Sequence, residues 1–280
     1  MIFSDAHLHT NPVRGLGARE IAKRVRLNNG WFLAIVSLTP QHYNLPLTFE
    51  GFQKMVNLII KESKAAAESG VKTVCLAGIH PGMVDQVLSK YSDIDKAREF
   101  LLRCLRYVAD KVRGGELIGI GEVGRQHYRV NPVNLLLSDY ILDRALEISR
   151  DLDCIVHLHL EQGSIITVEN ILEKVRRMNI KRDNIIIHHA DLNVATASIS
   201  NGLRVTVLGY ANMLNRLGGI IHNIMIESDY LDDLNRPGVC MYPWNIPNEI
   251  EKLIDAGKIS QDDLDKIFID RISEVYHIEY

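Results

Sequence analysis

Long apolar runs are missing from this sequence, although 46% of its 280 residues are hydrophobic. No segment approaches 18 uninterrupted apolar residues, so a membrane span is not indicated. The amino end carries no charged-then-apolar signal peptide, because Asp5 and His7 interrupt its first apolar run. We therefore expect a cytoplasmic protein that does not enter a membrane.

The sequence also has few cysteines and a small net charge. The four cysteines lie far apart and form no Cys-x-x-Cys pair. Cys75 and Cys154 lie inside apolar runs, which favours small buried residues in a reducing compartment. The formal net charge is -3. Such a chain has no global attraction to polyanions, so only a local basic patch could recruit nucleic acid.

No linker rich in proline, glycine or serine divides the chain, and no short repeat is visible. Instead, short runs of continuously apolar, β-branched residues recur, as expected of strands buried on both faces of a parallel sheet. Together with the amino-terminal run they make eight, at 31–39, 71–79, 116–121, 153–159, 184–189, 203–208 and 223–228.

Helical patterns fill the intervals between these runs. Thr48 is a candidate cap for the first of them, and Pro132 begins another. Further helices are expected at 165–178, 191–201 and 211–221, although the last contains two glycines. The alternation predicts an α/β fold, a single (β/α)8 TIM barrel over residues 1–246. Residues 247–280 are expected to form C-terminal helices packed on the barrel, within the same single domain.

In such a barrel all strands end at one face, where the active site is built. His7 and His9 end the first run, and two residues apart on a strand they share one face. Other metal-competent side chains end later runs: His80, Glu122, His157, His159, His188, His189 and Asp229. A lone histidine is more often a hydrogen-bonded core residue than a ligand. One shared metal site nevertheless explains all of these buried polar groups together.

The order of these residues resembles the TatD family, metal-dependent hydrolases of the amidohydrolase superfamily. The resemblance rests on His7-Leu8-His9, Gly121-Glu122-Val123-Gly124, a histidine on each of strands five and six, and Ser228-Asp229. The segment Gly78-Ile79-His80-Pro81 is similar to another segment of that family. The likeness spans the chain and is greatest to uncharacterised archaeal TatD-related proteins.

The resemblance implies a binuclear metal centre. His7, His9 and Asp229 would hold one divalent ion, His157 and a strand-six histidine the other, and Glu122 would bridge them. Matching strand six to the bacterial TatD pattern selects His188. Matching it to the archaeal relatives selects His189, and we prefer His189. His80, His159 and the remaining strand-six histidine would bind substrate.

Mixed imidazole and carboxylate ligands suit zinc, manganese, nickel, cobalt or magnesium. Two such ions would activate a water molecule, with Asp229 orienting it, accepting its proton and delivering the proton to the leaving group. The enzyme would act on an ester bond, and a deoxyribonuclease-type phosphodiester is the family default. No oligomeric state is predicted.

One departure from the TatD pattern favours cleavage of a different bond in the substrate. TatD enzymes usually carry an arginine where this chain has His159, and imidazole does not match the fit of a guanidinium to phosphate. A small-molecule amide or lactone is therefore the alternative substrate, and a non-catalytic metal-binding barrel is a third interpretation. Arg125, Arg129 and Arg216 remain as candidate phosphate contacts near the fourth and seventh strands.

Overall fold

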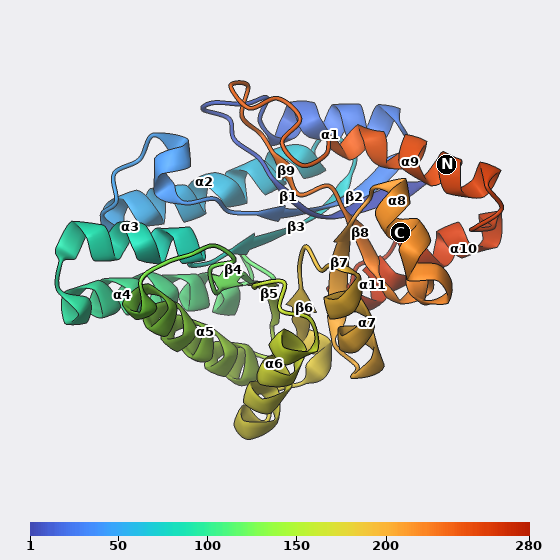
Figure 1. The fold of residues 1–280 in the computed structure, drawn as a ribbon. Coiled ribbons are helices and arrows are strands. Elements are labelled where there is room, and N and C mark those ends of the chain that lie inside the picture. Colours follow the sequence, from blue (N-terminus) through green and yellow to red (C-terminus); the bar gives the residue numbers. More distant parts are fainter.

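The computed structural model describes residues 1–280, apart from the side chain of Gln261. A parallel sheet curls through the molecule with helices outside it (Figure 1). Neighbouring strands follow chain order from β8 back to β1, and a ninth short strand pairs with β1. The strands are β1 Phe3–His9, β2 Gly30–Val36, β3 Lys72–Ala77, β4 Gly119–Gly124, β5 Ile155–His159, β6 Ile185–Ile187, β7 Arg204–Leu208, β8 Met225–Glu227 and β9 Tyr230–Leu231.

The first and last parts of the sheet are tied together just beyond β8. The backbone N–H of Asp229 donates to the carbonyl of His7 at 3.0 Å, and that of Ser228 donates to the Asp5 carboxylate at 2.9 Å. These bonds bring the residues that follow β8 beside β1. The expected α/β barrel architecture is thereby confirmed.

Helices connect the strands as the apolar patterns indicated. Thr48 caps α2 by accepting the backbone N–H of Gly51 at 3.1 Å. The helices before β8 are α1 Ala18–Leu27, α2 Phe49–Ala67, α3 Pro81–Tyr91, α4 Ile94–Arg113, α5 Pro132–Leu152, α6 Ile165–Met178, α7 Leu192–Ser200 and α8 Ala211–Leu217. Among the helices described, none has the length and hydropathy that crossing a membrane requires.

The helix expected over 211–221 is shorter than its pattern. It ends at Leu217, and a 3₁₀ segment continues over Gly218–Asn223. Gly218 has a φ of +51°, which lies outside the right-handed helical region. The glycines that weakened the helical pattern therefore mark its end.

The C-terminal helices pack on the barrel as expected. They are α9 Ile246–Asp255, α10 Gln261–Asp265 and α11 Arg271–Tyr276, with a π-helical turn over Lys266–Asp270 joining the last two. The last two helices and the turn between them bury an apolar stripe against the barrel, made of Leu264, Ile267, Phe268, Ile272 and Val275. The Trp31 indole N–H donates to the carbonyl of Phe268 at 2.8 Å, which fixes this segment beside β2.

Candidate metal centre

The end of β1 supplies two buried histidines to the barrel interior, His7 and His9. His9 has a defined orientation, because its Nδ1–H donates to the carbonyl of Val36 on β2 at 3.0 Å. Nδ1 keeps its proton in this bond, so once the ring is neutral Nε2 of His9 is the atom that offers a lone pair to a metal ion. This is the state in which a histidine binds a metal ion.

His7 receives its orientation from deeper in the barrel. The Tyr276 hydroxyl has one hydrogen, which it donates to the carbonyl of Ala6 at 3.0 Å. His157 must then donate its Nε2–H to the Tyr276 oxygen, also at 3.0 Å. Burial and the neighbouring histidines lower the pKa of His157 well below its usual value, so its Nδ1 carries no proton. It accepts from Nδ1–H of His7 at 2.9 Å, and Nε2 of His7 is left with a lone pair.

Glu122 on β4 lies where these two Nε2 atoms converge. Its Oε1 is 3.2 Å from Nε2 of His7 and 3.0 Å from Nε2 of His9. Oδ1 of Asp229 lies 3.5 Å from the same His9 nitrogen. Two imidazoles and one further carboxylate, that of Asp229, thus lie on the Oε1 side of Glu122.

The other oxygen of Glu122 has its own pair of histidines. Oε2 lies 2.7 Å from Nδ1 of His159 and 3.2 Å from Nε2 of His188. These two nitrogens are 3.1 Å apart. Nε2 of His159 has no hydrogen-bond partner among the described residues although it is buried.

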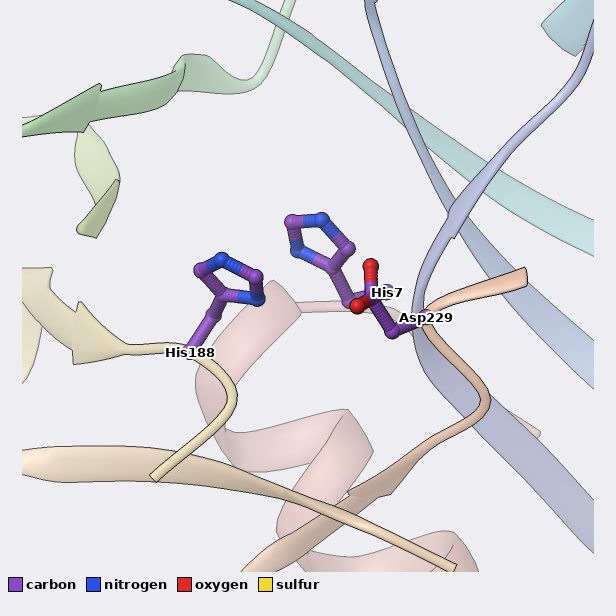
Figure 2. A group of neighbouring side chains, drawn as sticks. All are labelled: His7, His188 and Asp229. Carbon is purple, nitrogen blue, oxygen red and sulfur yellow. The ribbon is translucent and has the colours of Figure 1, made fainter. Parts of the chain in front are cut away.

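The spacing of both groups fits metal coordination. Four ligands that each bind zinc at about 2.0–2.1 Å lie about 3.3 Å from one another. Described side chains form several such sets of donor atoms, including His7, His9 and Glu122 as one and His80, Glu122 and His159 as another. Figure 2 shows a further set, in which His188 from beyond β6 points towards His7 of β1 and Asp229 lies beside His7.

The carboxylates of the cluster favour a positive charge between them. The pKa of His9 rises to about 10, because hydrogen bonds to Asp229 and Glu122 outweigh the opposing effect of burial. The pKa of His188 is raised well above its usual value by Glu122 and Glu227 despite burial. The His188 charge and hydrogen bonds from surrounding histidines keep the pKa of buried Glu122 well below its usual range. Protons on His9 and His188 therefore balance carboxylates that a divalent cation would otherwise neutralise.

His80 lies beside this cluster as a hydrogen-bond donor. It caps α3, where its Nδ1 accepts the backbone N–H of Gly82 at 3.0 Å. Burial lowers its pKa to about 3, so the ring is neutral and the proton is on Nε2. That N–H faces Oε2 of Glu122 at 3.6 Å.

Two predicted ligands lie apart from the two groups around Glu122. His157 uses both ring nitrogens, one with Tyr276 and one with His7, as described above. His189 follows β6 with its side chain 40% exposed, and its Nδ1 lies 2.9 Å from Oδ2 of Asp229. The strand-six histidine beside Glu122 is His188, and the strand-five histidine beside it is His159.

Other buried polar residues support the centre but were not predicted as site residues. Asp5 accepts the backbone N–H of both Ser228 and His7, and burial raises its pKa to about 7. Glu227 accepts the backbone N–H of His189 at 2.8 Å. Asp5 could have been found from its spacing, since it lies two residues before His7 on the same face of β1. Tyr276 had no comparable signal, because it is distant in sequence and ends an ordinary amphipathic helix.

Arg125, one of the candidate phosphate contacts, is engaged in ion pairs. Its guanidinium donates to both carboxylate oxygens of Glu161, at 2.9 and 2.6 Å, and to Asp139 at 3.0 Å. A further bond goes to the side chain of Asn170 at 2.7 Å. These acceptors neutralise the charge that a substrate phosphate would need.

The fold and the cluster define a class of protein: α/β barrels with histidines and carboxylates gathered where the strands end. Within that class, the model of the family described as TatD related DNase matches residues 4–277, so the chain belongs to this family. The resemblance seen in the sequence is confirmed.

Individual relatives are distant in sequence. An uncharacterised protein of Methanocaldococcus jannaschii is 24% identical, over 99% of this chain and 96% of that one. The structure of a TatD-like protein from Archaeoglobus fulgidus matches with a TM-score of 0.67 at 17% identity, covering 99% of this chain and all of that one (100%). A phosphotriesterase-like lactonase mutant from Deinococcus radiodurans matches with a TM-score of 0.63 at 10% identity, covering 98% and 95%.

Proposed function

We propose that this protein is a metal-dependent hydrolase that cleaves an ester bond with two divalent ions. The observation that carries the proposal is the position of Glu122. Each of its carboxylate oxygens lies within 3.2 Å of two imidazole nitrogens, on opposite sides of one side chain. A bridging carboxylate between two ions is the simplest cause of this arrangement.

The ligand set we propose differs at two positions from the one that the resemblance implied. His7, His9 and Asp229 would hold the first ion, as expected, with Glu122 as the bridge. His159 and His188 would hold the second, in place of His157 and His189. The reason is geometric: His159 and His188 direct nitrogens at Oε2 of Glu122, whereas both nitrogens of His157 are already bonded.

When bound, the ions would supply the Lewis acidity that makes a water molecule reactive near neutral pH. Asp229 would orient that water and accept its proton. Hydrogen bonds from His189 and His9 hold the pKa of Asp229 well below its usual range despite burial, so it is a carboxylate. His80 would donate its Nε2–H to a substrate oxygen, and His189 would keep Asp229 in place through Oδ2.

A phosphodiester is the first candidate for the bond, in keeping with the family description. A carboxylic ester, as in a lactone, is the second candidate, and two observations favour it. Arg125 is fully committed to Glu161 and Asp139, and with His159 as the strand-five ligand the residue two positions further on, where the family usually has its arginine, is Glu161.

The test is a screen of metal-depleted protein reconstituted separately with zinc, manganese, nickel, cobalt or magnesium. The substrates are bis-p-nitrophenyl phosphate, single-stranded DNA, lactones and N-acyl compounds. Asp229→Asn should lower turnover by about 10²–10⁴-fold, the range for a lost general base. Asp255→Asn, on the exposed surface of α9, is the matched control and should leave turnover unchanged.

Metal analysis of the same samples separates the alternatives. Two bound ions with turnover that depends on Asp229 would support the proposal. Bound metal without turnover of any substrate would indicate a non-catalytic metal-binding barrel. Turnover that survives in Asp229→Asn would contradict the role assigned to this residue.

A further inference from the structure

A cavity of about 300 Å³ adjoins the metal centre on the side of β6 and β7. This is the lower end of the range for small-molecule sites, about 300–1,000 Å³. The lining residues are Gln162, His189, Ala190, Asp191, Leu208, Tyr210 and Met213. His189 belongs to this wall and also contacts Asp229 at 2.9 Å, so the cavity begins beside the proposed general base.

The polar side chains of this wall are engaged by the protein. Gln162 donates to the carbonyl of His189 at 2.7 Å and accepts the backbone N–H of Asp191 at 2.9 Å. The Asp191 carboxylate caps α7 by accepting the backbone N–H of Val194 at 2.8 Å. The hydroxyl of Tyr210 donates to the carbonyl of Cys240. These bonds engage most of the polar groups that line the cavity.

The rest of the wall is mainly apolar. Ala190, Leu208 and Met213 provide apolar surface from three different elements or their ends. Neither lysine nor arginine is among the residues that line the cavity. A phosphate placed here would lose hydration without gaining a lysine or arginine partner, whereas an uncharged apolar group gains by leaving water.

We propose that this cavity, called here the acyl pocket, binds the unbranched alkyl chain of an uncharged carboxylic ester or lactone. The inference rests on the proposed hydrolase function and names the substrate class of its site. The carbonyl of the substrate would lie beside Asp229 while its chain extends past His189 towards Leu208 and Met213. Chain length then becomes the main determinant of specificity.

Two substrate series test this pocket on the metal-reconstituted protein. One comprises p-nitrophenyl esters from acetate to octanoate, and the other γ-lactones with alkyl substituents of increasing length. We expect kcat/KM to rise about fourfold for each added methylene until the pocket is full. A rise in one series alone would identify linear esters or lactones as the substrates whose alkyl chain the pocket binds. A flat profile in both would overturn the proposal.

Met213→Glu places a carboxylate in the pocket at a half-buried position on α8. It should lower the ratio of kcat/KM for octanoate over acetate at least tenfold. Leu136→Glu is the matched control, because Leu136 is 66% exposed on α5 and should leave the ratio unchanged. An unchanged ratio in Met213→Glu would overturn the pocket.

Binding without turnover separates this inference from the proposed function. Calorimetric titration with hexanamide and acetamide measures occupancy of the pocket without any ester cleavage. Tighter binding of hexanamide, weakened by Met213→Glu, would support the pocket even if no ester were hydrolysed. Hydrolysis of esters with no preference for hexanamide would support the hydrolase and overturn the pocket.

Discussion

His157 and His159 lie two residues apart on β5, so their side chains leave the same face of the strand. They nevertheless reach different surroundings. His157 is fully buried between Tyr276 and His7, and both of its ring nitrogens are bonded there. His159 ends the strand beside Oε2 of Glu122, and its Nε2 has no partner among the described residues.

The difference comes from depth within the barrel. A two-residue step along a strand moves a side chain about 6.6 Å along that strand, towards the end of the barrel. That step carries the imidazole from the region filled by the C-terminal helix to the face where the strands end. The same residue type is thus a positioning residue at one depth and a candidate ligand at the next.

The largest effect that would test this comparison is expected from His159→Gln. The glutamine side chain places no metal-binding atom where Nδ1 of His159 faces Glu122, so the second ion should be lost. We expect bound metal to fall from two ions to one per chain and kcat/KM to fall about 10²-fold or more. Metal analysis by mass spectrometry, together with kinetics, measures both. Two ions retained at normal affinity would show that His159 is not a ligand.

Much of the centre could be predicted from the sequence because it depends on strand ends. His7, His9, Glu122 and Asp229 end or follow their strands in an order that the barrel topology brings together. The alternation of apolar runs and helical patterns was sufficient to predict that topology. These residues meet through backbone geometry, which a sequence pattern encodes well.

The choice between neighbouring histidines could not be made in the same way. It depends on about one residue of register at the end of β6 and on the packing of Tyr276, which is 119 residues from His157 in sequence. Hydrogen-bond partners of this kind are set by tertiary packing, which leaves no local pattern. The residues that support the candidate ligands were therefore harder to identify than the candidate ligands.

A smaller and more selective effect is expected at His157. In His157→Gln the amide can still donate to Tyr276, but nothing accepts from Nδ1–H of His7. In His157→Asn the shorter amide can offer its oxygen to His7 while the bond to Tyr276 is lost. If His157 positions His7, the glutamine variant should bind metal about 10–100-fold more weakly and still hold two ions. The asparagine variant should be less affected.

Competition with a chelating dye gives the affinity of each His157 variant, and metal analysis gives its stoichiometry. Loss of one ion in both variants would restore His157 to the ligand set implied by the family resemblance. Equal affinity losses in both, with two ions retained, would remove the orientation of His7 as the explanation. The pair of variants therefore separates a ligand from a residue that positions one.

The smallest expected effect is at Tyr276, which acts on the centre only through His157. Tyr276→Phe removes the acceptor for Nε2–H of His157 and the donor to the carbonyl of Ala6. Leaving such groups unpaired in the core costs about 1–3 kcal/mol of unfolding free energy. His157 also becomes free to carry its proton on Nδ1, where it would oppose Nδ1–H of His7. We therefore expect metal affinity to fall about tenfold or less, with two ions still bound.

Tyr280→Phe is the control, because Tyr280 is 63% exposed near the same end of the chain. A loss of thermal stability without any change in metal affinity would show that Tyr276 only packs the core. A loss of affinity in Tyr276→Phe that disappears when combined with His157→Asn would show that its effect passes through His157, because the asparagine no longer depends on the tyrosine hydroxyl.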